Sequence, residues 1–255
     1  MKIYPIPAFN DNYIWALVSD RQCWVVDPGD AQPVERFLRS RALTLEGILI
    51  THHHSDHTGG IKTLKHDRKL RVVGANHASI EGLTEQLDEG ESVDILGASF
   101  TCMKVPGHTL DHVCYFAQLA THPVLFCGDT LFAAGCGRLF EGTAEQMWHS
   151  LSKLAELPSD TEVYPAHEYT LSNLEFALAV EPDNQQLNHR LEEVTALRNR
   201  GVPSLPTTIG LEKATNPFIR ASERGIRLKA EALTGQSLSA DSEVFAVIRR
   251  YKDNF

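Results

Sequence analysis

The sequence of 255 residues predicts an α/β domain over residues 1–166, followed by a smaller α-helical domain over residues 167–255. In the first range, short apolar runs alternate with turn-forming residues, as they do where strands and helices follow one another. In the second range, apolar residues recur at the spacing of amphipathic helices. Hydrophobic residues make up 42% of the chain, so a sizeable core is expected.

Strands are predicted where short apolar runs lie between turn signals. Residues 13–18 and 23–27 predict a pair of strands, and Gly97 with Ala98 predicts the turn of a later hairpin. The other predicted strands are residues 46–51, 70–75, 112–118, 124–129 and 162–167.

Helices are predicted from their start signals and their periodicity. Pro33 suits the first position of a helix, which we expect to continue to about Arg41. Thr143 and Gln146 form a capping-box pattern at the start of a helix over residues 143–157. The other predicted helices are residues 59–66, 171–180, 184–200 and 242–253, and the turn-rich residues 201–218 contain no predicted strand.

Charge and cysteine content narrow the class of protein. The formal net charge is −9 and no long basic run occurs, so neither nucleic acid nor a membrane surface is the expected partner. Pro5 and Pro7 interrupt the apolar residues of the N-terminus, which therefore does not resemble a signal peptide, and no apolar stretch reaches the length of a membrane span. The five cysteines are odd in number and widely spaced, which predicts reduced thiols in a cytoplasmic protein.

The segment THHHSDH, residues 51–57, follows a predicted buried strand and contains four histidines and an aspartate, which are side chains of metal-ligand type. His52 and His54 are two residues apart and can point the same way, as alternate residues of an extended chain do. Asp56 and His57 are adjacent and are expected to diverge, which suggests a second metal beside the first. His53 is out of phase with these ligands. The alternative explanation is a polar turn that happens to be rich in histidine.

Three later residues also follow predicted strands: His108, Asp129 and His167. Each one alone is better explained as a cap or a hydrogen-bond partner of a turn. Together they share one position, because ligands at the strand ends of an α/β sheet converge on one edge. Asp129 has two carboxylate oxygens and could bridge two metals. His112 is either close to this site or a packed residue at the start of a strand.

These motifs and their order resemble the metallo-β-lactamase superfamily and, within it, the hydroxyacylglutathione hydrolase (glyoxalase II) family. The resemblance covers nearly the whole chain through the segments AFNDNYIW, VVDPGDA, THHHSDHTGG, PGHTLDH, FCGDTLF, GCGRLFEGT, AHEYTLSN and RRYKDNF. It implies an αββα sandwich followed by a smaller helical substrate-binding domain. It also implies two divalent metal ions, zinc foremost with iron or manganese as alternatives. The implied ligands are His52, His54 and His108 for one metal, Asp56, His57 and His167 for the second, and Asp129 as the bridge.

The resemblance further implies that Arg138, Tyr169, Arg249 and Lys252 contact glutathione. Without it, Arg249 and Lys252 would be interpreted as a solvated helix end, where basic side chains suit the helix dipole. The chain departs from the family pattern at two positions. Phe140 stands where many members have tyrosine, and Asp111 stands where glycine is common.

The implied activity is thioester hydrolysis by a monomeric enzyme with a small-molecule substrate: S-D-lactoylglutathione and water yield glutathione and D-lactate, the second step of methylglyoxal degradation. The expected nucleophile is a hydroxide held between the two metals, with no nucleophile from the protein. A thiolate leaves with little acid assistance because a thiol pKa is near 8.5, which agrees with the lack of an obvious general acid.

Four alternative functions are less favoured by the sequence. A persulfide dioxygenase of the same superfamily would use a single iron. A β-lactamase would leave the basic residues unexplained and often has cysteine where this chain has Asp129. A nuclease would need a basic surface. A metal-dependent sensor of glutathione conjugates would bind without turnover, and a thioesterase assay separates it from an enzyme.

Overall fold

The computed structural model describes residues 1–255 and divides into two compact units. The first unit contains Met1–Lys104 and Asp111–Gly128, and the second contains Val105–Leu110 and Asp129–Phe255. The two compact units do not test the domain boundary predicted between residues 166 and 167, which stays a prediction.

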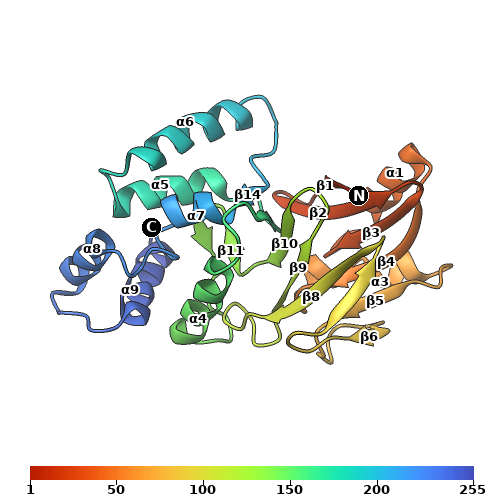
Figure 1. The fold of residues 1–255 in the computed structure, drawn as a ribbon, viewed down its shortest axis with the longest axis horizontal. Helices are drawn as coiled ribbons and strands as arrows, with labels where there is room; N and C mark the ends of the chain where they lie inside the picture. Colours follow the sequence, from red (N-terminus) through yellow and green to blue (C-terminus); the bar gives the residue numbers. More distant parts are fainter. The chain divides into compact units, whose positions relative to one another are not determined.

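A six-stranded sheet forms one layer of the first unit (Figure 1). Its strands, in sheet order, are β1 (Lys2–Ala8), β2 (Asn12–Ser19), β3 (Gln22–Val26), β4 (Thr44–Ile50), β5 (Arg71–Gly74) and β6 (Glu85–Gln86). The first three strands are antiparallel, and β3 to β6 are parallel. The predicted strands at residues 13–18, 23–27, 46–51 and 70–75 are confirmed. The histidine-rich segment follows β4 directly.

Strand β1 is absent from the sequence prediction because Pro5 and Pro7 interrupt it. Proline has no N–H group to donate to a neighbouring strand, and sheets tolerate it chiefly on edge strands. Strand β1 is such an edge: its only neighbour is β2, where Pro5 lies opposite Trp15 and Pro7 lies opposite Tyr13.

Helices α1 (Ala31–Arg41), α2 (Ser55–Thr58) and α3 (Ile61–Lys65) also belong to the first unit. Val34 and Leu38 of α1 and Leu64 of α3 share one buried apolar cluster with side chains of β1 to β5, so α1 and α3 cover one face of the sheet. The prediction that the first helix begins at Pro33 is wrong by two residues. The helix begins earlier because Asp30 caps it, its carboxylate accepting a hydrogen bond of 2.9 Å from the Gln32 N–H.

The second layer of the first unit is antiparallel, with strands in the order β10-β9-β8-β7. These strands are β7 (Ser92–Ile95), β8 (Ala98–Lys104), β9 (Val113–Gln118) and β10 (Pro123–Gly128). The hairpin turn lies at Leu96 and Gly97, with φ of 49° and 83°, one residue before the predicted turn, because Ala98 already pairs with Ile95. Tyr115 is fully buried and its hydroxyl donates to the Ile50 carbonyl at 2.7 Å, which joins the two layers.

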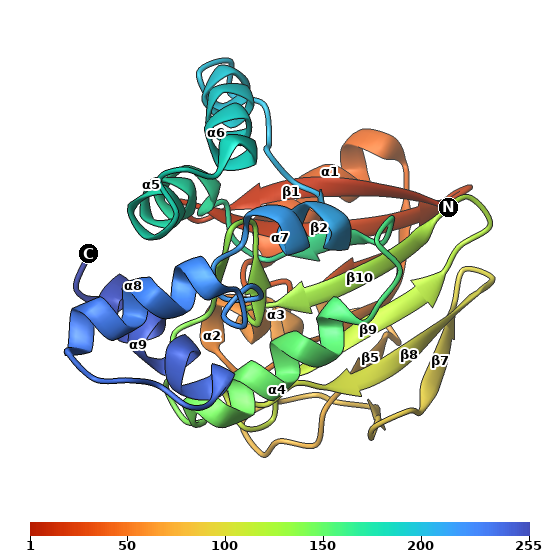
Figure 2. The same cartoon turned by 60° about the vertical axis from the view of Figure 1, so that its left-hand side comes forward.

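The second unit is mainly helical (Figure 2). The helix over residues 143–157 is confirmed as α4, with Thr143 and Gln146 forming the predicted capping box. The three predicted helices that follow residue 167 are confirmed as α5, α6 and α9. The elements of this unit are β11 (Leu131–Phe132), β12 (Gly135–Cys136), α4 (Ala144–Ala155), β13 (Glu162–Pro165), α5 (Thr170–Val180), α6 (Gln185–Arg198), β14 (Thr207–Thr208), α7 (Ile209–Thr215), α8 (Arg224–Thr234) and α9 (Asp241–Asp253).

The turn-rich stretch 201–218 is more regular than predicted, because it contains the short strand β14 and the helix α7. Thr208 ends the strand and caps the helix by accepting a hydrogen bond of 3.2 Å from the Leu211 N–H. Helix α8 is also missing from the prediction. It buries only Ile226 and Ala230, which is too short an apolar stripe for a periodic signal.

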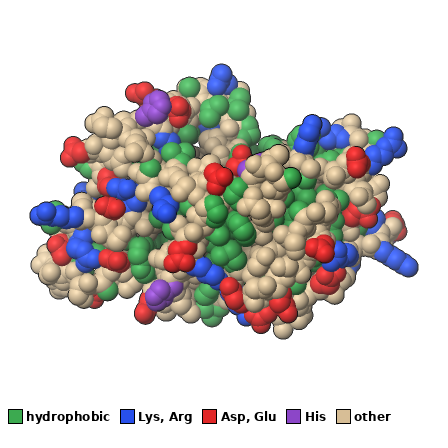
Figure 3. Space-filling model, viewed as in Figure 1, with side chains coloured by type: hydrophobic (Ala, Val, Ile, Leu, Met, Phe, Trp, Pro, Cys, Tyr) green, Lys and Arg blue, Asp and Glu red, His purple; other side chains and the backbone are tan.

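Basic and acidic side chains are intermixed on the face of the molecule shown in Figure 3. None of the helices combines the length and the apolar character that crossing a membrane requires. All five cysteines are free and buried. Burial raises the pKa of Cys23 and Cys102 to about 12 and that of Cys136 to about 11, the opposite of what activates a cysteine nucleophile.

Candidate metal centre

The histidines that follow β4 present ring nitrogens to one another within the first unit. The Nε2 atom of His52 lies 3.1 Å from Nδ1 of His54, so these two side chains point the same way, as their alternation predicts. The other ring nitrogen of His52 lies 3.1 Å from the Thr51 hydroxyl. His112 stacks on the buried His52 ring at 4.6 Å, which places it beside the site rather than only in the strand packing.

Asp56 and His57 lie on the single turn of α2, and the expectation that they diverge is wrong. The Nε2 atom of His57 lies 3.4 Å from the Asp56 carboxylate. His57 is completely buried, and its Nδ1 atom lies 3.0 Å from the Asp27 carboxylate. The Asp27 carboxylate therefore faces Nδ1 of His57, and Nε2 is the nitrogen that faces Asp56.

Asp27 and Asn12 contact the side chains of His57 and Asp56, and neither was among the residues predicted from the sequence. Asp27 holds His57, and Asn12 donates a hydrogen bond of 3.1 Å to the Asp56 carboxylate. Asp27 follows β3 directly. The other candidates were selected as ligand-type residues at strand ends, and the same criterion could have selected Asp27. The backbone around Asp56 is also closely packed, because a Cβ atom at Gly29 would lie only 1.8 Å from the Asp56 carbonyl oxygen.

Three of the predicted ligands meet in the second unit. Asp129 directs one carboxylate oxygen toward each of two histidines: Oδ2 lies 3.4 Å from Nε2 of His108, and Oδ1 lies 3.4 Å from Nε2 of His167. All three side chains are buried. The Nδ1 atom of His108 lies 2.9 Å from the Arg138 carbonyl oxygen, to which it donates, so its Nε2 faces the carboxylate.

These spacings fit divalent metal ions. Two ligand atoms that bind one tetrahedral ion at about 2.1 Å lie about 3.4 Å apart. The Asp56–His57, His108–Asp129 and His167–Asp129 pairs all have this separation. Metal-binding histidines commonly donate their other ring N–H to a carboxylate or a carbonyl group. The clusters of histidine and aspartate in this fold therefore suggest a binuclear site for divalent metal ions.

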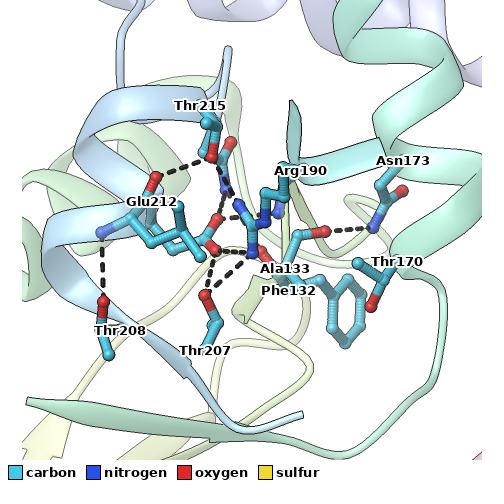
Figure 4. A network of polar contacts seen from close by, with 12 residues as sticks. Phe132, Ala133, Thr170, Asn173, Arg190, Thr207, Thr208, Glu212 and Thr215 are labelled. Atoms are coloured by element: carbon cyan, nitrogen blue, oxygen red, sulfur yellow. Dashed lines mark hydrogen bonds and ion pairs between the residues drawn. The ribbon is translucent and has the colours of Figure 1, made fainter. Parts of the chain in front are cut away.

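A buried ion pair anchors the segment that follows Asp129 (Figure 4). Arg190 of α6 and Glu212 of α7 lie 2.6 Å apart, and Glu212 also accepts a hydrogen bond of 2.8 Å from the Ala134 N–H. Asn173 of α5 donates to the Ala133 carbonyl at 3.1 Å. These bonds hold the β11–β12 hairpin, which lies between Asp129 and Arg138.

A cavity of about 700 Å³ in the second unit contains both His108 and Asp129 and all four predicted glutathione contacts, which are Arg138, Tyr169, Arg249 and Lys252. The interpretation of Arg249 as part of a solvated helix end is wrong, because the side chain is buried. Its guanidinium donates to the Cys136 carbonyl at 2.9 Å and to Asp253 at 3.0 Å, and it lies over the Phe218 ring.

The other three residues differ in exposure. Lys252 is partly buried and donates to the Ser172 carbonyl at 2.9 Å, and its pKa falls to about 8, first because of burial and then because of Arg249. Arg138 is exposed and lies 3.9 Å from Asp253. The Tyr169 ring stacks on His167, with 4.7 Å between ring centroids. 

Phe140 also lines this cavity, and its largely exposed ring makes a T-shaped contact with the His108 ring. The ring has no hydroxyl group, so the side chain offers no hydrogen bond to a ligand at this position.

Solved structures with the same fold include several metallo-beta-lactamases. ETHE1 from Myxococcus xanthus is similar with a TM-score of 0.66 and 24% identity, over 99% of this chain and 98% of that chain. The protein TTHA1623, solved in a di-iron-bound form, is similar with a TM-score of 0.60 and 23% identity, over 84% of this chain and 99% of that chain. At these identities the likeness establishes the fold, an αββα sandwich with an added helical part.

Similarity in sequence identifies the family more narrowly than similarity in fold does. The model of the metallo-beta-lactamase superfamily matches residues 9–167, and the model described as the hydroxyacylglutathione hydrolase C-terminus matches residues 168–255. The chain is 54% identical to a hydroxyacylglutathione hydrolase of Pseudomonas aeruginosa over the full length of both proteins. It is 52% identical to a hydroxyacylglutathione hydrolase of Hahella chejuensis, over 100% of this chain and 99% of that protein. The chain therefore belongs to the hydroxyacylglutathione hydrolase family of the metallo-β-lactamase superfamily.

Proposed function

We propose that the protein is a binuclear metal-dependent thioester hydrolase that converts S-D-lactoylglutathione and water to glutathione and D-lactate. One observation carries the proposal: a single cavity presents His108 and Asp129 beside Arg249 and Lys252. Metal ligands and cationic side chains are thus available to the same bound molecule. The full-length identity of 54% to a relative named hydroxyacylglutathione hydrolase supports the same activity.

The proposal assigns the ligands as the family pattern implies. His52, His54 and His108 bind one metal, and Asp56, His57 and His167 bind the second. Asp129 bridges them, which is supported by its two oxygens lying 3.4 Å from two different histidines. Zinc is the metal we favour, and imidazole and carboxylate ligands also suit iron and manganese.

When bound, a pair of divalent metals lowers the pKa of water to about 7 and polarises a carbonyl group, which is the chemistry that thioester hydrolysis requires. The side chains prepare this chemistry. Asp27 holds the Nδ1 atom of His57, and the Arg138 carbonyl holds that of His108, so both Nε2 atoms are directed before metal binds. The thiol leaving group has a pKa near 8.5 and departs as thiolate with little acid assistance.

The proposal places glutathione in the 700 Å³ cavity and assigns residues 167–255 as the domain that binds it. The tripeptide carries two carboxylates, and the cavity offers the guanidinium groups of Arg138 and Arg249 and the amine of Lys252. Tyr169, stacked on His167, borders the same space. An assay of thiol release from S-D-lactoylglutathione tests the activity. If no thiol is released while a glutathione persulfide drives oxygen uptake, the protein is a dioxygenase instead.

The metal content of the protein is the first prediction. Protein purified without chelator is expected to contain two equivalents of divalent metal per chain after dialysis, because seven ligands exceed what one four- to six-coordinate ion needs. Elemental analysis of the dialysed protein, with activity measured on the same sample, checks this. A reproducible single equivalent with full activity would contradict the binuclear proposal and would favour a mononuclear iron enzyme.

The pH dependence of substrate capture is the second prediction. Lys252 is charged below its pKa of about 8 and neutral above it, so its attraction for a substrate carboxylate weakens as the pH rises. We expect kcat/KM, which reports groups of the free enzyme, to fall by up to about tenfold as the pH rises through 8.

Lys252→Arg should remove this step from the pH profile, because arginine stays charged. Lys213→Arg is the matched control, since Lys213 is exposed and lies outside the cavity. A step that persists unchanged in Lys252→Arg would show that another group titrates there.

A further inference from the structure

A second cluster of ligand-type side chains lies in the first unit and shares no residue with the proposed binuclear site. It consists of His53, His77 and Asp111, and one donor atom from each lies within 4.8 Å of the others. The Nδ1 atom of His53 lies 2.9 Å from the Asp111 carboxylate. The His77 ring stacks on the His53 ring, with 4.1 Å between centroids and 19° between planes.

The tertiary fold assembles this cluster from three separate segments. His53 follows β4, His77 lies in the loop after β5, and Asp111 precedes β9. The Asp111 side chain is only 5% exposed and that of His53 is 16% exposed, so a carboxylate is largely withdrawn from water beside two imidazoles. Burying a carboxylate is costly unless a positive partner or a metal compensates for the lost hydration.

A hydrogen bond between His53 and Asp111 accounts for two of the three residues. His77 is held by its stacking on His53 and by one long hydrogen bond of 3.3 Å, which its Nδ1 atom accepts from the Ser79 N–H. The pair formed by His66 and Asp67 illustrates the difference. It has the same separation of 2.9 Å, but both side chains are largely exposed, and no third ligand-type residue joins them in a cluster. Of these two pairs, only His53 and Asp111 combine low exposure with a third ligand-type side chain nearby.

We propose that His53, His77 and Asp111 form an accessory binding site for one divalent metal ion of the zinc type. Two imidazoles and a carboxylate are good ligands for Zn²⁺ and Co²⁺. The terminal torsion of histidine is broad, so the half-buried His77 can turn its ring nitrogen toward an ion shared with its neighbours. Three protein ligands leave at least one position for water, so this ion should exchange more readily than a fully protein-coordinated one.

An ion at the accessory site would also affect the segment that contains His52 and His54. His53 lies between His52 and His54 in the chain, so an ion at the accessory site ties their loop to the loop that contains His77. The inference does not rest on the proposed activity, because it concerns metal binding alone.

The test compares the metal content of the holoenzyme with that of two variants. Wild-type protein, His77→Gln and His66→Gln are each titrated with Zn²⁺ against a chromophoric chelator, which counts bound equivalents. Wild-type protein and His66→Gln are expected to bind one equivalent more than His77→Gln. The comparison uses the difference in zinc equivalents between His77→Gln and the other two proteins. It can therefore be interpreted even if the main site holds a number of ions other than two.

A second measurement guards against a folding defect in the variant. In wild-type protein, added Zn²⁺ should slow the modification of His77 by a histidine-specific acylating reagent, while the modification of His66 stays unchanged. Peptide mass analysis reads both rates in one sample. Equal zinc content in wild-type protein and His77→Gln, or modification of His77 at the same rate with and without zinc, would overturn the proposal.

Discussion

Asp129→Ala is expected to lose metal from both proposed sites and to lower kcat/KM by at least about a thousandfold. Its two carboxylate oxygens lie 3.4 Å from His108 and from His167, so one substitution removes a ligand from two ions. Metal ions stabilise a developing oxyanion by several kcal/mol, and about 4 kcal/mol corresponds to a thousandfold in rate. His57→Ala removes a ligand from one ion only and should retain more metal. Elemental analysis and thiol-release kinetics on the same samples measure both effects.

Asp160→Ala is the control for this experiment, because Asp160 is an exposed aspartate of the same unit outside the cavity. It should keep the metal content and turnover of the unmodified protein. Circular dichroism distinguishes a local loss of metal from unfolding in Asp129→Ala. Should Asp129→Ala keep two metals and near-normal turnover, Asp129 is a turn residue and another group bridges the ions.

Arg249→Ala is expected to raise KM for S-D-lactoylglutathione by about ten- to a hundredfold, with a much smaller fall in kcat. A hydrogen bond to a charged group contributes about 1.5–3 kcal/mol, and a contact made equally in the ground and transition states acts chiefly on KM. The buried guanidinium also bonds the Cys136 carbonyl and Asp253, so the melting temperature should fall as well. Metal content should not change, because no proposed ligand follows His167.

Arg250→Ala provides a matched control, since Arg250 is the next residue of α9 and is exposed. It removes the same charge from the same helix but not from the cavity, and KM should stay within about twofold of the unmodified value. Lys252→Ala should resemble Arg249→Ala. If both cavity variants bind the substrate normally, α9 is only structural, and recognition rests on Arg138 and Tyr169.

The elements that could be predicted from the sequence are those with a strong local signal. The apolar runs of β2 to β5 and the capping box of α4 predict their own structure, because nearby residues determine them. The missed elements depend on distant partners. Strand β1 keeps two prolines because it lies at a sheet edge, and β14 consists of two residues that pair with β13. Helix α8 buries too few apolar residues to show a period.

For the site, the type and position of the candidate ligands were visible in the sequence, whereas their mutual arrangement was not. Asp56 and His57 were expected to diverge, but their side chains approach to 3.4 Å. Asp27 was not selected, although it holds His57 at 3.0 Å. Its partner is fixed by the parallel pairing of β3 with β4, which a single sequence does not reveal.

By itself, the sequence determined which side chains can bind metal and that most of them follow strands, because ligand chemistry and short-range pattern are local properties. Only the tertiary structure decided which nitrogen of His57 and His108 is available, since a partner from another segment occupies the other nitrogen. It also decided that Arg249 is buried beside Cys136, a residue 113 positions away. Burial and protonation depend on what surrounds a group, and folding brings those surroundings from distant parts of the chain.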